Sequence, residues 1–250
     1  MNRQLYSILL YLLLPLLLLY LAVRAFKSPG YRGRWGERFA LKRLKATDLL
    51  VHSVSMGETI AAIPLIKRIQ AEQPNLRITV TTSSPTGSAE VLRAFGDTVQ
   101  HCYLPFDLAW CSKRFVEQLT PKTSIIMETE LWPNLVYFLH RKHTKILLAN
   151  ARLSQKSADA YRKRLTLAGP MLAQLDAVAA QSEQAANRFI ELGVAPSKVT
   201  VCGSLKFDLN IAPERIAAAK KMRTDWHASE RQVWVAGSVH PGEFNSMIQA

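Results

Sequence analysis

The stretch Val51-His-Ser-Val-Ser-Met-Gly-Glu58-Thr-Ile-Ala-Ala62 decides how this chain folds. An apolar run ends here in small and polar residues, Gly57 and Glu58 follow, and an apolar-periodic segment then runs from Ile60 to Ile69. That order is typical of a strand, a tight turn and a helix. Ligands bind at the carboxyl ends of strands in open α/β sheets. Glu58 is therefore a candidate general base, although a first-turn acid that only favours the helix dipole has the same pattern.

Short β-rich runs and helical patterns continue to alternate beyond this stretch. The predicted strands are 49–54, 77–82, 99–103, 123–127, 145–149, 177–180 and 198–202. The predicted helices are 59–71, 88–95, 108–118, 133–141, 155–174 and 183–192. Strands that alternate with helices indicate βαβ units, a parallel sheet and right-handed crossovers. We therefore expect an α/β, Rossmann-like N-terminal domain over residues 48–210.

The last part of the chain begins a similar pattern again. Pro213 is typical of the first position of a helix, predicted over 214–226. A strand over 232–237 then leads into His240-Pro-Gly-Glu243, a turn followed by an acid, as at Glu58. We expect residues 211–250 to hold an interdomain helix and only the start of a second Rossmann-like domain, because one βα unit cannot bury its own apolar face.

The N-terminus carries an uncharged apolar segment. Leu5 to Val23 is long enough to span a bilayer as a helix. Pro15 leaves a second possibility, a helix that lies in one leaflet. Basic residues are more frequent after the segment than before it, which places the rest of the chain in the cytoplasm by the positive-inside rule. We predict a membrane anchor over residues 1–26.

The charge of the chain is strongly basic and unevenly distributed. The formal net charge is +13, and the stretches 24–45 and 141–164 carry +7 each, so the remainder sums to −1. The first stretch adjoins the anchor, which favours an anionic membrane surface over nucleic acid. A basic juxtamembrane segment is expected over residues 27–47, with Trp35 at headgroup depth and its arginines on lipid phosphates, unless it is a plain basic linker.

Metal and disulfide chemistry have little support in the sequence. Cys102, Cys111 and Cys202 show no paired spacing, so in a cytoplasmic compartment they are most simply free thiols. No His, Cys and Asp cluster has metal-ligand spacing, so neither a metal nor another cofactor is expected. The chain also lacks a nucleic-acid recognition motif.

Further polar residues follow other predicted strands. Glu128 and Glu130 come after the strand 123–127, where a carboxylate can stabilise positive charge that develops in a transition state; two acids near a helix start are also ordinary capping residues. Lys206 follows the last strand and can meet a phosphate or carboxylate as a point charge. An exposed lysine without such a role has the same pattern.

Two more strand ends carry hydroxyl and basic groups. Thr81-Thr-Ser-Ser-Pro-Thr-Gly-Ser88 is a strand-to-helix turn whose backbone N–H groups can accept an anion, with Thr86 either in the site or simply the N-cap. Arg152 follows the strand 145–149 and leads into the second basic stretch. Its guanidinium can engage a phosphate, or it can belong to a solvated helix face.

Taken together, these motifs resemble a known family. They occur in the order Tyr31-Arg-Gly-Arg-Trp-Gly-Glu-Arg38, His52-Ser-Val-Ser-Met-Gly-Glu58, Thr81-Thr-Ser-Ser-Pro-Thr-Gly87, Met127-Glu-Thr-Glu-Leu-Trp-Pro-Asn134, Asn150-Ala-Arg-Leu-Ser154, Gly203-Ser-Leu-Lys-Phe-Asp208 and His240-Pro-Gly-Glu243. The chain closely resembles the bacterial Kdo (3-deoxy-D-manno-octulosonic acid) transferases over essentially its whole length.

The resemblance implies a GT-B type glycosyltransferase of two Rossmann-like domains that works without a metal. It implies transfer of Kdo from CMP-Kdo to lipid IVA, the lipid A precursor, at the cytoplasmic face of the inner membrane in lipopolysaccharide biosynthesis. The family's general base corresponds to Glu58, and its transition-state-stabilising positions correspond to Glu128 and Lys206. The expected acceptor-binding positions are Ser55, Gly57, Thr86, Glu130 and Arg152.

The resemblance also sets expectations for the rest of the protein and for competing functions. The family binds the CMP moiety in the second domain, most of which this chain lacks, so we expect the chain alone to be inactive. A membrane-anchored module that binds an anionic glycolipid without turnover is the main alternative. Another GT-B enzyme, such as a heptosyltransferase, shares the architecture but not these motifs.

Overall fold

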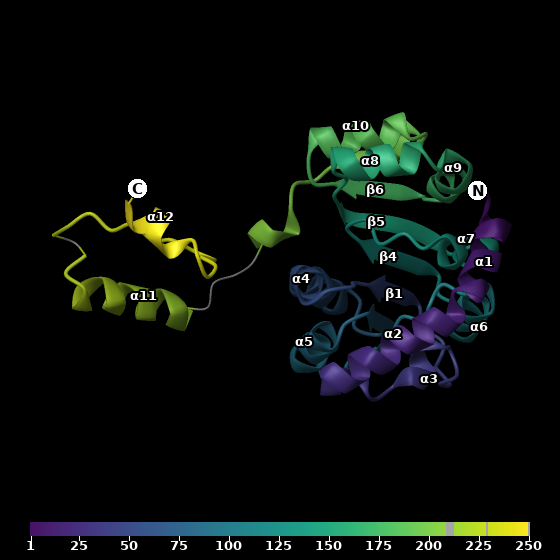
Figure 1. The fold of residues 1–250 in the computed structure, drawn as a ribbon, viewed down its shortest axis with the longest axis horizontal. Helices are drawn as coiled ribbons and strands as arrows, with labels where there is room; N and C mark the ends of the chain where they lie inside the picture. The colour runs from purple at the N-terminus through teal and green to yellow at the C-terminus, as the bar shows by residue number, and fades with distance from the viewer. Residues whose placement is uncertain (209–212, 229, 250) are drawn as a thin grey trace. The chain divides into compact units, whose positions relative to one another are not determined.

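A computed structural model describes residues 1–208, 213–228 and 230–249. The chain divides into two compact units, Met1–Asp208 and Leu209–Ala250 (Figure 1). The first unit contains the sheet and nearly all of the candidate residues.

The first unit is built on a seven-stranded, entirely parallel sheet in the order β3-β2-β1-β4-β5-β6-β7. The strands are β1 Leu49–His52, β2 Ile78–Thr82, β3 Gln100–Tyr103, β4 Thr123–Met127, β5 Lys145–Ala151, β6 Ala177–Ala180 and β7 Val199–Val201. The order reverses between β1 and β4, which is the topological switch point where open α/β sheets bind ligands. The predicted parallel sheet and Rossmann-like topology are confirmed.

Helices cover both faces of the sheet (Figure 1). They are α4 Met56–Glu72, α5 Pro85–Phe95, α6 Ala109–Leu119, α7 Pro133–Arg141, α8 Gln155–Arg162, α9 Leu165–Ala173 and α10 Glu183–Glu191. Alternate strand residues face opposite sides. Leu49 and Val51 pack in the core with α4 and α5, whereas Leu50 packs in the core with α6, α7 and α9. The result is a three-layer domain with two apolar cores.

One predicted helix is two helices in the structure. The pattern predicted a single helix over 155–174, but the chain leaves the helical conformation at Arg164, whose φ is −122°. The break lets α8 pack against α10 while α9 packs against α7. A straight helix cannot reach both neighbours, so tertiary packing overrides the local pattern here.

The N-terminal apolar segment also bends. It forms α1 Arg3–Leu12 and α2 Leu14–Lys27, which are inclined by 55°. Pro15 lies in the first turn of α2 and has no N–H to continue the helix from α1. No single helix in the described ranges is long and apolar enough to cross a membrane, although the bent pair meets that criterion jointly by length and composition. The expected single helix over Leu5 to Val23 is therefore wrong.

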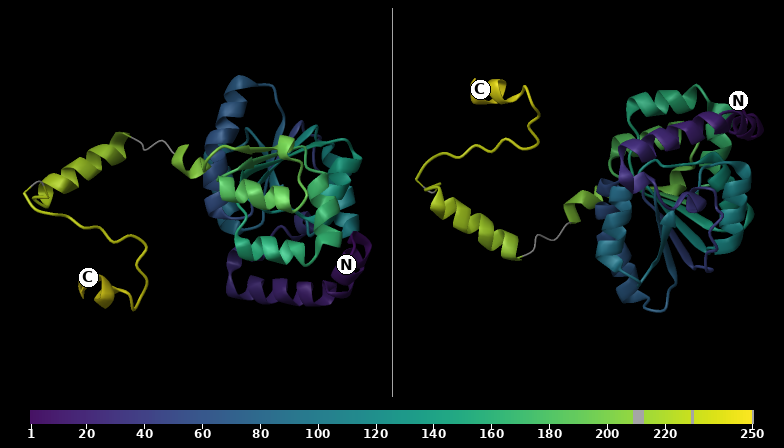
Figure 2. Two further views of the ribbon diagram at one scale, coloured as in Figure 1. Left: turned by 90° about the horizontal axis from the view of Figure 1, so that it is seen from above. Right: turned by 60° about the horizontal axis from the view of Figure 1, so that its bottom comes forward.

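A buried polar cluster attaches α1 to the domain, against which both N-terminal helices lie (Figure 2). The Tyr6 hydroxyl donates to Oδ2 of Asp107 at 3.1 Å, and Ser7 Oγ donates to Oδ1 of Asn134 at 3.0 Å. Asp107 also accepts the backbone N–H groups of Asn134 and Leu135, both at 2.8 Å. The Asp107 carboxylate therefore caps the start of α7 and attaches α1 to it.

The basic segment after α2 forms η1 Pro29–Tyr31 and α3 Trp35–Arg38, and it packs against the domain. The Trp35 indole N–H donates to the backbone oxygen of Tyr31 at 2.7 Å. Arg38 is only 5% exposed and donates through Nη2 to the backbone oxygen of Ser83 at 3.1 Å. Arg38 therefore does not lie on the open surface of the segment, where its arginines are expected from the sequence to meet lipid headgroups, because folding buries it.

The second unit contains α11 Pro213–Asp225 and α12 Phe244–Gln249. The predicted helix after Pro213 is confirmed. The predicted strand over 232–237 is wrong, because residues 230–243 form neither strand nor helix. Trp234 and Val235 are 67% and 78% exposed. A strand forms through backbone pairing with a neighbour, and no strand lies within residues 230–249 to supply it.

We expect Asp107→Asn to lower the free energy of unfolding by about 2–4 kcal/mol, because an amide cannot accept all the donors that converge on this buried carboxylate. Urea denaturation of the 250-residue chain measures the change. Asp159→Asn is the matched control, since Asp159 is half exposed and pairs with Arg162 on the surface of α8. If the two variants lost equal free energy of unfolding, the Asp107 cluster would contribute no more to stability than a surface ion pair.

Candidate active site

Glu58 lies at the start of α4, directly after β1, where Ser55 is the N-cap. Its Oε1 accepts from the Ser55 hydroxyl at 2.8 Å and from the Ser55 N–H at 3.3 Å, and its Oε2 accepts from the Val54 N–H at 2.9 Å. The arrangement is a capping box, and Glu58 is 8% exposed. Glu58 is therefore a first-turn acid, as the alternative interpretation of the sequence expected, and it also forms a capping box.

The capping contacts leave Glu58 with unused acceptor capacity. A carboxylate oxygen has about two lone pairs. Oε2 accepts one hydrogen bond from the described residues, whereas Oε1 accepts two. The capping box thus fixes the side chain and leaves Oε2 able to accept a proton, so the two interpretations of Glu58 are compatible.

Glu128 follows β4 on the other side of the switch point. Its φ is 54°, in the left-handed region, and its N–H donates to the backbone oxygen of Ala149 at 2.9 Å. A non-glycine residue in this region costs about 1–3 kcal/mol, a strain that is frequent at functional sites. Burial and the charge of Glu58 raise the pKa of Glu128, whereas Lys206 and Arg152 lower it. The fold therefore brings Glu58, Glu128, Lys206 and Arg152 within one electrostatic environment.

Glu130 lies in the loop before α7 and is half-buried. Burial raises its pKa to about 7, with further contributions from the negative charges of Glu58 and Glu128. Glu130 in turn contributes to a raised pKa of Tyr161 on α8, below the effect of burial itself. The three carboxylates are therefore close enough to couple, and Glu130 holds its proton toward neutral pH.

Asn150 is a candidate residue that sequence reasoning missed. It is the last residue but one of β5 and has a φ of 53°, and its Oδ1 accepts the N–H of Leu205 at 3.1 Å. Leu205 begins η3 Leu205–Asp208, which carries Lys206. Nδ2 of Asn150 is buried with no hydrogen-bond partner in the described part of the chain. From the sequence, Asn150 is identified only as the first residue of the motif Asn150-Ala-Arg-Leu-Ser154, with no role assigned to it. Asparagine is also common at left-handed positions.

The expected acceptor positions on α4 and α5 lie close together. The N-cap of α5 is Ser84, whose Oγ accepts the Gly87 N–H at 3.1 Å, so the alternative that Thr86 is the N-cap is wrong. A Cβ on Gly87 would lie 3.2 Å from Oγ1 of Thr59, so the glycine permits α5 to approach α4. Space beside Gly57 is open, and Thr86 is exposed.

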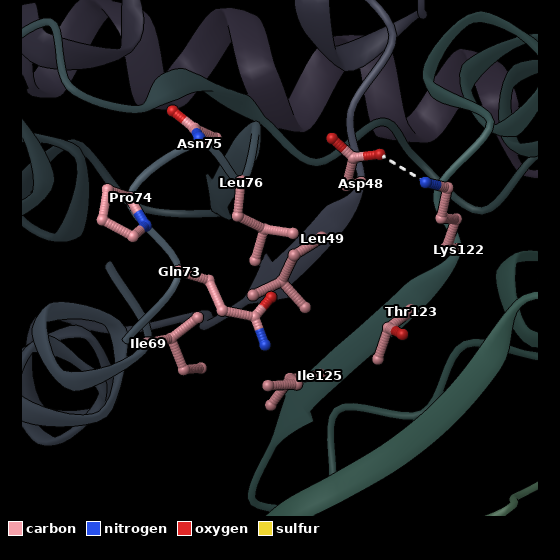
Figure 3. A pocket seen from close by; sticks show the side chains of 10 residues that line it. All are labelled: Asp48, Leu49, Ile69, Gln73, Pro74, Asn75, Leu76, Lys122, Thr123 and Ile125. Carbon is pink, nitrogen blue, oxygen red and sulfur yellow. Dashed lines mark ion pairs between the residues drawn. The ribbon is translucent and has the colours of Figure 1, made fainter. Parts of the chain in front are cut away.

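A hollow lies at the opposite edge of the sheet, away from the candidate residues (Figure 3). Its volume is about 770 Å³, and it lies where β1 and β4 begin, with Leu49 and Thr123 in its wall. Asp48 at its rim forms ion pairs with Lys122 at 3.1 Å and Arg77 at 2.9 Å. The amino ends of parallel strands rarely form the active site. None of the candidate residues lines this hollow.

The described residues include no group of three or more His, Cys, Asp or Glu side chains able to hold a metal ion. The expectation of a reaction without metal or cofactor stays a prediction. Cys102 and Cys111 are buried and Cys202 is exposed, and all three are free thiols, as expected.

The topology of the sheet defines the class of fold. It is that of the N-terminal Rossmann-like domain of the GT-B type fold. Among solved structures, UDP-GlcNAc 2-epimerase from Neisseria meningitidis bound to UDP-GlcNAc matches with a TM-score of 0.50 at 15% identity. That match covers 71% of this chain and 53% of the epimerase. It supports the fold alone.

Sequence comparison then identifies the family. Residues 33–209 match the family model described as 3-Deoxy-D-manno-octulosonic-acid transferase (kdotransferase). The chain is 39% identical to the 3-deoxy-D-manno-octulosonic acid transferase of Haemophilus influenzae and 32% identical to that of Bordetella pertussis. Both alignments cover 100% of this chain and 59% of the relative. The chain belongs to the Kdo transferase family and spans about three-fifths of the length of these relatives.

The raised pKa of Glu130 predicts a pH-dependent stability. In the unfolded chain this carboxyl ionises at its ordinary pKa, whereas in the folded chain it keeps its proton until about pH 7. The free energy of unfolding therefore falls as pH rises between those values. We expect the free energy of unfolding of Glu130→Gln to be ~1–2 kcal/mol higher than that of the parent chain near pH 8.5, after discounting for partial exposure. Near pH 5 the two free energies should be equal.

Urea denaturation at the two pH values measures this difference. Glu117→Gln on the exposed side of α6 is the control, and it should shift stability equally at both pH values. A Glu130→Gln gain that is the same at both pH values would contradict the proposed ionisation of Glu130.

Proposed function

We propose that this chain forms the acceptor-binding side of an inverting glycosyltransferase that moves Kdo from CMP-Kdo to lipid IVA in lipopolysaccharide biosynthesis. The single observation that carries the proposal is the convergence of Glu58 and Glu128 on the two sides of the switch point, in a chain of this family. Residues 48–210 are the proposed acceptor-binding domain.

Glu58 is the proposed general base. It takes the proton of an acceptor hydroxyl while that oxygen attacks the anomeric carbon of Kdo. The bond between that carbon and the CMP phosphate oxygen breaks, and CMP leaves with the electron pair. Attack on the face opposite the leaving group inverts the configuration. The capping box supports this role, because it holds the carboxylate in one rotamer with Oε2 available.

Glu128 and Lys206 are proposed to balance charge in the transition state. Positive charge develops on the sugar as the bond to CMP breaks, and a nearby carboxylate stabilises it. Lys206 offers a cation to the departing phosphate or to the Kdo carboxylate. The positive charge of Lys206 lowers the pKa of Glu128, so the two side chains lie near enough to act on the same substrate. This supports a role for Glu128 toward the positive sugar and for Lys206 toward the negative groups.

The acceptor is proposed to contact the surrounding polar groups. Ser55 and Gly57 begin α4, Thr86 begins α5, and Glu130 and Arg152 follow β4 and β5. All five are at or beyond the carboxyl ends of strands, so they share one edge of the sheet. Arg152 is exposed and suits a phosphate of the acceptor, whereas a protonated Glu130 can donate a hydrogen bond to a sugar oxygen.

The protein is proposed to act at the inner membrane, with the catalytic portion on the cytoplasmic side. The apolar residues along α1 and α2 support this, since Leu12, Leu16 and Leu19 are 72%, 61% and 61% exposed. Basic residues follow directly after the two helices. Contiguous exposed apolar surface marks a protein or membrane interaction site.

We expect Glu58→Gln to lower the rate of Kdo transfer by about 10²–10⁴-fold, because an amide cannot accept the proton. Glutamine also satisfies a capping box, so α4 should keep its start and its stability. Glu72→Gln at the other end of α4 is the matched control. Transfer from CMP-Kdo to lipid IVA is measured for this chain and for a form joined to the remaining C-terminal part of the Haemophilus influenzae relative.

The outcomes separate the two functions under consideration. Transfer that Glu58→Gln abolishes and Glu72→Gln preserves supports the enzyme. Acceptor binding without CMP release, in both forms of the chain, would instead favour a membrane-anchored module that binds an anionic glycolipid without turnover.

Asn150 is expected to act through Lys206. Asn150→Gly keeps the left-handed φ without strain and removes the hydrogen bond to Leu205. We expect it to lower kcat about 10-fold or more, and to add almost nothing in the background of Lys206→Ala. A double-mutant cycle in the joined form measures this coupling. Additive losses would show that Asn150 acts independently of Lys206.

A further inference from the structure

Two adjoining cavities lie between the N-terminal helices and the loops that follow β3 and β4. They share the side chains of Phe106, Asp107 and Trp132 in their walls. Trp132 belongs to the loop that carries Glu128 and Glu130. The Cβ position of Gly30, just after α2, lies 3.0 Å from Cβ of Pro85 at the start of α5. These contacts place the pair of cavities beside the carboxyl edge of the sheet.

The first cavity is apolar and has a volume of about 460 Å³. Its other lining residues come from the bend between α1 and α2 and from the start of α6, and are Tyr6, Leu10, Leu13, Leu16, Leu17 and Leu108. Its polar side chains, those of Tyr6 and Asp107, hydrogen-bond to each other at 3.1 Å. A cavity of this size and lining suits an alkyl chain, because it offers few partners to water.

The second cavity is smaller, about 210 Å³, and contains two cations, Arg24 and Arg38. The Arg38 guanidinium is buried, and no carboxylate in the described ranges lies within 4.0 Å of it. Glu37, its neighbour in sequence, instead pairs with Arg34 at 2.8 Å and Lys42 at 2.9 Å. A buried cation without a counter-charge is costly, so this cavity favours an anion.

Asp107 does not supply the missing counter-charge. Its two oxygens accept hydrogen bonds from the backbone N–H groups of Asn134 and Leu135 and from the hydroxyls of Ser112 and Tyr6. Its charge therefore faces the positive start of α7. Arg38 makes one hydrogen bond to the Ser83 carbonyl and otherwise contacts aromatic rings.

We propose that the two cavities together bind one acyl chain and an adjoining anionic group of the lipid-linked acceptor. The alkyl chain occupies the bend between α1 and α2, and the phosphate or carboxylate lies near Arg24 and Arg38. That the bound lipid is the acceptor, and not bulk phospholipid, rests on the proposed function. Trp132 supports this assignment, because it lines both cavities and belongs to the loop that carries Glu128 and Glu130.

Alkyl phosphates of increasing length test the site with the 250-residue chain, below their micelle concentrations. Calorimetry should show binding that tightens about fourfold for each added methylene, from ~0.8 kcal/mol per buried CH₂, and that levels off once the cavity is full. Dodecyl maltoside, which has a neutral head, should bind at least 10-fold more weakly than dodecyl phosphate. Affinity that keeps rising with length would indicate a general lipid surface and overturn the proposal.

Neighbouring leucines on α2 provide a matched pair of variants. Leu17 lines the apolar cavity, whereas Leu18 is 40% exposed and does not. Leu17→Trp should fill the cavity and weaken dodecyl phosphate binding at least 10-fold, and Leu18→Trp should leave it unchanged. Arg24→Gln should weaken dodecyl phosphate but not dodecyl maltoside. An equal loss of dodecyl phosphate affinity in the two tryptophan variants would contradict the proposed site. Equal affinity for dodecyl phosphate and dodecyl maltoside would contradict it as well.

The joined form used for the transfer assay distinguishes the acceptor from bulk lipid. Leu17→Trp should raise the KM for lipid IVA and leave kcat unchanged, because it removes binding energy that ground state and transition state share. An unchanged KM in a variant that no longer binds dodecyl phosphate would assign the cavities to phospholipid. Binding of alkyl phosphate in a protein without Kdo transfer would leave the site in place and refute only the proposed enzyme function.

Discussion

The crowding of three carboxylates at one edge of a parallel sheet is the constraint on which the candidate site depends. Because β1 and β4 are adjacent, the residues that follow them are held together whatever their charge. Each carboxylate meets this constraint differently. Glu58 accepts hydrogen bonds from the start of its own helix, Glu128 lies within the field of Lys206 and Arg152, and Glu130 retains a proton. Carboxylates held in different environments in this way can take different roles in one reaction.

The sheet could be predicted from the sequence because its signals are local. Strands 123–127 and 177–180 match the structure, since buried parallel strands are short apolar runs between turn signals. The failures have two physical causes. The bend at Leu13 follows from Pro15, which is visible in the sequence, whereas the break at Arg164 and the missing strand over 232–237 depend on which partner each segment packs against. Local periodicity carries no information about that partner.

The same distinction holds within the site. Glu58 was identifiable because its strand, turn and helix are contiguous in the sequence. The same local pattern predicted both the general base and the first-turn acid. Asn150 was not identifiable, because its contact with Leu205 joins residues 55 positions apart. Counting charges likewise treats every arginine as solvated, yet Arg38 is buried between Tyr31 and Tyr103. Contacts of this kind join residues far apart in the chain, so the local pattern around each residue does not reveal them.

The N-terminal helices show why hydropathy alone is an incomplete description of such a segment. An ordinary surface helix turns its apolar side inward. Here Tyr6 and Ser7 face inward and reach Asp107 and Asn134, while leucines such as Leu12 face outward. The polar contacts hold α1 against the start of α7, directly after the loop that carries the candidate carboxylates. The direction in which the apolar side faces is thereby fixed relative to the candidate site. A lipid-borne acceptor held on those helices would then approach the carboxylates from the side on which the helices lie.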